Sequence, residues 1–73
     1  MKLGNDLKRC RFDNDAMSQE ALARAVGVTR QTIISIEKGR FVPSTLLSLK
    51  LARFFNKSVD EIFYISDEDE NQE

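Results

Sequence analysis

The chain has no histidine, no tryptophan, one cysteine and one proline among its 73 residues. One thiol cannot form an internal disulfide, and without histidine a conventional zinc site is excluded as well. The lack of histidine also removes the commonest general base, and we find neither a nucleophile–base pair nor a glycine-rich phosphate loop. We therefore expect no metal, no cofactor and no enzymatic activity.

Long apolar runs and a secretory leader are also missing, which predicts a cytoplasmic protein with no membrane partner. The net charge of −1 hides an asymmetry, because residues 1–65 carry all 11 basic residues against seven acidic ones. The other five acidic residues lie in 66–73, without a basic residue among them. The sequence thus predicts one basic domain over 1–65 and a disordered acidic tail over 66–73, which either aids solubility or competes for the basic surface.

Residues 18–40 read SQEALARAVGVTRQTIISIEKGR, a run typical of two short helices joined by a tight turn. Ser18 is a suitable N-cap for the first helix, and Thr29 is one for the second. Gly27 suits a turn that needs a positive φ, and Gly39 suits the end of the second helix.

The two sides of the second helix differ in chemistry. At about 100° per residue, Ile33 and Ile36 fall on one side, and Gln31, Ile34, Ser35 and Lys38 fall on the other. Arg30 lies at the exposed N-terminal end. An ordinary surface helix would carry Glu/Lys pairs here, whereas an arginine, a glutamine and small polar groups suit hydrogen bonds to base edges in a major groove. The pattern predicts a helix that contacts double-stranded DNA.

The motifs TRQTI and IEKGR, together with FVPSTLLSLKLARFFNKSVDEIF after them, resemble the helix-turn-helix domain of phage-repressor/Cro-type (XRE family) transcriptional regulators. The resemblance is to the short, single-domain members and covers about residues 3–65. It implies an all-α, five-helix domain that binds a pseudo-palindromic operator as a homodimer, with repression as its main outcome. We expect the first helix to begin after Gly4 or Asn5, and a short strand pairing of Tyr64 and Ile65 with residues 1–3 is a further possibility.

Ten residues are candidates for contacts with DNA. Four are assigned to base edges: Arg30, Gln31, Ile34 and Ser35. Six are assigned to the sugar-phosphate backbone: Gln19, Thr29, Thr32, Lys38, Arg40 and Ser44. Arg30 could take a phosphate instead of a guanine, and Thr32 could touch a thymine methyl. Ile34 departs from the polar residue usual in the family, so it either reads a thymine methyl or packs into the core.

Two more expectations follow from the resemblance. Arg11, late in the first helix, should form a largely buried ion pair with Glu37; the alternative is a solvated surface cation. The C-terminal region should form the homodimer interface, because it carries more apolar side chains than a lone chain of this size can bury. The candidates for that interface are Leu49, Phe54, Ile62, Phe63, Tyr64 and Ile65.

Two other classes of function compete with this interpretation. A protein-interaction module, such as an antitoxin with another protein as its partner, would keep the same fold and could keep DNA binding. A small enzyme is the weaker alternative, because the chain has no histidine and no nucleophile–base pair.

Overall fold

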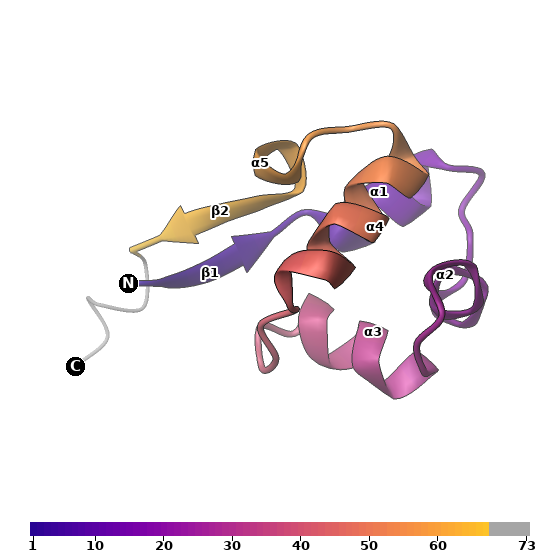
Figure 1. The fold of residues 1–73 in the computed structure, drawn as a ribbon, viewed down its shortest axis with the longest axis horizontal. Helices are drawn as coiled ribbons and strands as arrows, with labels where there is room; N and C mark the ends of the chain where they lie inside the picture. The colour runs from indigo at the N-terminus through magenta and orange to yellow at the C-terminus, as the bar shows by residue number, and fades with distance from the viewer. Residues whose placement is uncertain (68–73) are drawn as a thin grey trace.

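The computed structural model describes residues 1–67, and the rest of the predicted acidic tail, 68–73, lies outside the described residues. Seven elements follow one another in the described part: β1 (Lys2–Asn5), α1 (Leu7–Asp13), α2 (Gln19–Val26), α3 (Arg30–Glu37), α4 (Thr45–Phe55), α5 (Val59–Ile62) and β2 (Phe63–Ser66). The helices form one body, and the two strands extend from it as an arm (Figure 1). The predicted five-helix fold and its terminal strand pairing are both confirmed.

Side-chain caps set the starts of three helices. The hydroxyl oxygens of Ser18, Thr29 and Ser44 accept hydrogen bonds from the backbone N–H groups of Ala21, Thr32 and Leu47, at 3.0, 3.2 and 3.1 Å. Each bond satisfies one of the N–H groups that a helix leaves without a partner at its first turn. The starts of α2, α3 and α4 are therefore fixed by residues next to them in the sequence.

The core draws on every helix and on β2. Its buried apolar residues are Leu7, Cys10, Leu22, Ala23, Val26, Ile33, Ile36, Leu47, Leu51, Ala52, Ile62 and Phe63. Burial raises the pKa of the Cys10 thiol, so this side chain packs as a small neutral group. The inward faces of α2 and α3 thus lie against α4, and the outward face of α3 is left free.

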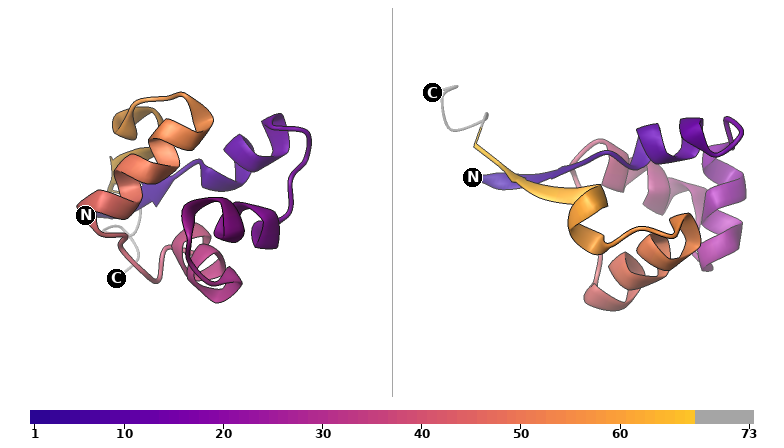
Figure 2. Two further views of the ribbon diagram at one scale, coloured as in Figure 1. Left: turned by 45° about the vertical axis from the view of Figure 1, so that its right-hand side comes forward. Right: turned by 90° about the horizontal axis from the view of Figure 1, so that it is seen from above.

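The strands β1 and β2 pair antiparallel, with Leu3 opposite Ile65 and Gly4 opposite Tyr64. The Tyr64 ring lies over Gly4, because a Cβ atom added there would meet Tyr64 Cε1 at 2.3 Å. In the view from above, the arm projects from one end of the helical body (Figure 2). Two predicted boundaries shift: α1 begins at Leu7, after a strand that takes up residues 2–5, and Ser66 belongs to β2 and not to the tail.

Within residues 1–67, no helix combines the length and the apolar character needed to cross a membrane. The same part of the chain holds no group of three His, Cys, Asp or Glu side chains placed to bind a metal ion.

Candidate nucleic-acid interface

The turn between α2 and α3 sets how the two helices meet. Gly27 has a φ of 78°, a conformation that favours glycine, and the Val28 N–H closes the turn on the Ala23 carbonyl oxygen at 2.9 Å. In Figure 1, α3 lies along the lower edge of the body with α4 above it. Its inner side holds Ile33 and Ile36, both buried in the core.

The outer face of α3 consists of Gln31, Ile34, Ser35 and Lys38, with Arg30 at its N-terminal end. Arg30, Gln31 and Lys38 are exposed, and Ile34 and Ser35 are half-buried. Ile34 belongs neither to the described core cluster nor to the partly buried apolar residues packed against it. The structure therefore places Ile34 outside the core cluster, half-buried on the outer face of α3, and its contact with a thymine methyl stays a prediction.

Beside this outer face lies a hollow of about 300 Å³, which is lined by Thr29, Gln31, Thr32, Ser35, Arg40 and Phe41. The hydroxyl oxygens of Thr29 and Thr32 lie 3.0 Å apart, so these two predicted backbone contacts share a hydrogen bond with each other. Five of the six lining residues were candidates from the sequence, and Phe41 was not. An apolar residue after a helix gives no signal by itself, so only the folded arrangement brings it to this surface.

Glu37, the last residue of α3, is the centre of a partly buried polar cluster. Arg11 of α1 donates from Nε to Glu37 Oε2 at 2.6 Å and from Nη2 to Oε1 at 3.0 Å. Gln19, the first residue of α2, donates from Nε2 to the same Oε1 at 3.1 Å. The Gln19 amide has a second hydrogen, so it can still donate to a phosphate from this position. The three helices are thereby tied together at one edge of the candidate interface.

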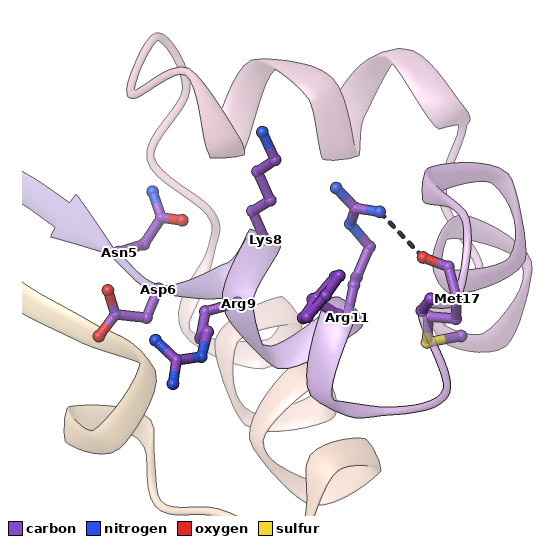
Figure 3. Close-up of a pocket in the computed structure, with 8 residues that line it drawn as sticks. Asn5, Asp6, Lys8, Arg9, Arg11 and Met17 are labelled. Atoms are coloured by element: carbon purple, nitrogen blue, oxygen red, sulfur yellow. Dashed lines mark hydrogen bonds between the residues drawn. The ribbon is translucent and has the colours of Figure 1, made fainter.

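Arg11 makes one more contact, from Nη1 to the Met17 carbonyl oxygen at 2.9 Å (Figure 3). It also lines a hollow of about 450 Å³ along α1. Lys8, one turn earlier, points from α1 toward α3, as Arg11 does (Figure 3). Lys8 was not among the predicted residues, although it lies three positions before Arg11 and therefore shares its face of α1.

Asn5 links the strand arm to the end of α3. Its Nδ2 donates to the Ile36 carbonyl oxygen at 2.9 Å, and its Oδ1 accepts from the Leu7 N–H at 3.0 Å. One side chain thus binds a carbonyl near the C-terminus of α3 and the first N–H of α1. Sequence reasoning missed Asn5, since the first of these contacts spans 31 residues.

The remaining candidates surround the outer face of α3. Arg30, Lys38 and Arg40 are exposed, and within residues 1–67 none of them is held in an ion pair. Ser44 is exposed, and its hydroxyl oxygen caps α4. Free cations around a donor-rich helix face form a surface that suits a polyanion.

Residues 15–62 match the family profile described as Helix-turn-helix. A Bacillus subtilis protein, named the uncharacterized HTH-type transcriptional regulator YgzD, is 47% identical over 60 residues, which are 82% of this chain and 86% of that protein. The chain belongs to the XRE-type helix-turn-helix regulators. An HTH-type transcriptional regulator of Methanocaldococcus jannaschii is 47% identical over 53 residues, 73% of this chain and 80% of its own. Another, of Archaeoglobus fulgidus, is 52% identical over 53 residues, 73% of this chain and 75% of its own. Because the chain belongs to this family, it is a DNA-binding protein that regulates transcription.

The residues predicted for a homodimer interface fall into two groups. Ile62 and Phe63 are 0% and 6% exposed within their own chain, so their assignment to an interface was wrong. The reason is that Ile62, at the end of α5, and Phe63, at the start of β2, both belong to the buried core of their own chain. Leu49, Phe54, Tyr64 and Ile65 are exposed in the regulator.

These four exposed residues do not form a single patch. Leu49 lies beside Leu46 and Val59 in a hollow of about 580 Å³, and Leu46 is an exposed residue that the sequence analysis left out. Phe54 lines other hollows, one of them with Arg24 and Gly27, and its ring packs edge-on against Phe55 with centroids 5.0 Å apart. Leu46, Leu49 and Val59 therefore form an apolar group around one hollow.

Proposed function

We propose that this regulator is a sequence-specific repressor that binds a pseudo-palindromic operator as a homodimer, with α3 of each subunit in a major groove. The observation that carries the proposal is the outer face of α3. This face is rich in hydrogen-bond donors and free of acidic residues, and it lies beside cations that have no partner within residues 1–67. A major groove is wide enough to admit a helix with such a face.

Base recognition falls to the four residues assigned from the sequence. Gln31 can span N6 and N7 of an adenine, and Arg30 can span O6 and N7 of a guanine. Ser35 can donate to or accept from either, and Ile34 offers an apolar surface to a thymine methyl. Each well-placed bidentate contact contributes about 1–3 kcal/mol to discrimination between bases.

Backbone contacts hold α3 in register. Lys38 and Arg40 take phosphates on one side of the groove, and the exposed Ser44 lies close to them in sequence. On the other side, Gln19 and the N-terminal N–H groups of α2 face the second strand, where the positive end of the helix dipole favours a phosphate. Thr29 and Thr32 add hydroxyls at the start of α3. These contacts are independent of sequence, and they make the affinity depend strongly on salt.

The homodimer would be built on Leu46, Leu49 and Val59, with Tyr64 and Ile65 of the strand arm as further candidates. Leu46, Leu49, Tyr64 and Ile65 are exposed and Val59 is half-buried. Burying the apolar surface that they expose contributes about 25 cal/mol per Å². A twofold axis through this region gives two α3 helices that meet half-sites about one helical turn apart. A dimer bound there represses transcription by occupying DNA that polymerase needs.

A second candidate function rests on the same apolar hollow. Lys50, Arg53 and Lys57 line it together with Leu46 and Leu49. An acidic, partly apolar segment of another protein fits this combination of charges. In that case the purified regulator is a monomer by sedimentation and forms a stoichiometric complex with the partner.

Selection of bound duplexes from random DNA, repeated over a salt series, tests the proposed function. We expect a consensus with twofold-related half-sites and a linear fall of log K with log salt concentration. Sedimentation equilibrium on the same preparation gives the subunit number. A protein that binds no duplex even at low ionic strength contradicts the proposal.

A further inference from the structure

Phe41 is a large apolar side chain that the proposed function leaves without a role. It is 46% exposed and lies between α3 and α4. It lines the hollow beside the outer face of α3, together with Gln31, Thr32 and Ser35. Two of these three residues, Gln31 and Ser35, are the ones assigned to base edges, so Phe41 lies where base edges would come.

The segment that carries Phe41 is held at both ends. On its N-terminal side, the Gly39 N–H donates to the Ile36 carbonyl oxygen at 3.0 Å, and the Arg40 N–H donates to the Ser35 carbonyl oxygen at 2.9 Å. On its C-terminal side, Pro43 is buried and Ser44 caps α4. The four anchored positions, 39, 40, 43 and 44, leave only residues 41 and 42 between them. The exposed ring is therefore kept at the edge of the outer face of α3.

The surroundings of Phe41 indicate what it contacts. Its neighbours in the hollow are hydroxyl groups, an amide and the Arg40 guanidinium, which suit DNA better than an apolar protein surface. Among the groups that base pairs present in the major groove, the 5-methyl of thymine is the apolar one, and phenylalanine is among the side chains that contact it.

We propose that Phe41 is a specificity-determining residue that contacts the 5-methyl group of a thymine at the edge of each half-site. This inference rests on the proposed function, since it needs α3 in the major groove. The contact by Phe41 adds a preference for thymine at the edge of the half-site, a position that none of the four base-contact residues reads. Arg40, next to it, anchors the same stretch to a phosphate.

The test replaces single thymines of the selected operator with deoxyuridine, which removes only the methyl group. Besides the thymine assigned to Ile34, we expect one further position in each half-site where this change weakens binding of the wild type about three- to fivefold, the effect of one buried methyl. At that further position the change should leave the affinity of Phe41→Ala unaltered. Val42→Ala is the matched control, because Val42 is exposed and does not line the hollow, and it should keep the full deoxyuridine effect.

The outcomes separate the inference from the proposed function. If Phe41→Ala keeps the wild-type deoxyuridine effect at every thymine, the inference is overturned and operator binding still stands. If Phe41→Ala loses affinity evenly for all duplexes, the ring lies against sugars and the inference is overturned as well. A wild type that binds no duplex overturns both. Phe41→Gln, which keeps the length and loses the apolar contact, must behave as Phe41→Ala does, and thermal unfolding confirms that each variant is folded.

Discussion

Arg11 and Glu37 are 26 residues apart in sequence, and their side chains meet in two hydrogen bonds, of 2.6 and 3.0 Å. The Arg11 side chain is 13% exposed and the Glu37 side chain 8%, so the pair is largely withdrawn from water. Such a pair contributes little net stability, but removal of one partner leaves an uncompensated charge. Because the pair joins α1 to the end of α3, it also fixes the position of the helix that we place in the groove.

Arg11→Met should destabilise the fold by about 3 kcal/mol, near the lower end of the range for breaking a buried pair. Glu37 would then keep only the Gln19 amide as a side-chain partner among the described residues. Urea unfolding followed by circular dichroism measures the change. The matched control is Arg24→Met, because Arg24 forms an exposed pair with Glu20 and its loss should change the stability by less than about 1 kcal/mol. Equal effects of the two substitutions would show that burial of the Arg11 pair is irrelevant to stability.

Gln31→Ala and Arg40→Ala should change DNA binding in different ways. Loss of Gln31 should relax the preference at one base position, with a cost of about 1–3 kcal/mol for the preferred base. Loss of Arg40 should weaken all duplexes evenly and reduce the slope of log K against log salt by about 1.8 for the dimer, which is about 0.9 for each subunit. Binding of a panel of single-base operator variants at several salt concentrations distinguishes the two. A uniform loss for both variants would contradict the division between base and backbone contacts.

Leu49→Lys should convert a homodimer into monomers, because a further cation beside Lys50, Arg53 and Lys57 loses its hydration in the interface without gaining an acidic partner. Sedimentation equilibrium measures the mass. Phe12→Lys is the matched control, since Phe12 is an exposed apolar residue on α1 that lines a different hollow. An unchanged dimer mass in Leu49→Lys would place the subunit contact elsewhere.

Glu61 should make stability depend on pH in the acid range. The backbone N–H of Ser58 donates to Glu61 Oε1 at 2.7 Å, and the Ser58 hydroxyl donates to the same oxygen at 3.2 Å. These two hydrogen bonds, the backbone one most of all, hold the pKa of Glu61 below its ordinary value. A lowered folded-state pKa means that the stabilisation is present above the unfolded value of about 4.3 and is lost as the pH falls through the folded value. Thermal unfolding from pH 7 to pH 3 should therefore show a larger loss for the wild type than for Glu61→Gln, which does not titrate. Parallel curves would exclude the contribution.

Several parts of this fold follow from interactions within four residues, and these were predictable. Ser18, Thr29 and Ser44 cap helices through N–H groups three positions on, and Gly27 takes the positive φ that the turn requires. The outer face of α3 also follows from helical spacing alone. The Arg11–Glu37 pairing was expected only because of the family resemblance, since no local pattern joins two helices so far apart in the chain.

The sequence by itself determined where α2, α3 and α4 begin, which side of α3 faces inward, and which residues form its outer face, because caps and periodicity act over one or two turns. Tertiary structure alone decided that Ile62 and Phe63 complete the core, that Gln19 donates to Glu37, and that Phe41 lies beside the outer face of α3. These outcomes depend on which surfaces remain free after distant elements have packed. An apolar residue is buried, or left for a partner, according to the space that the rest of the chain leaves around it.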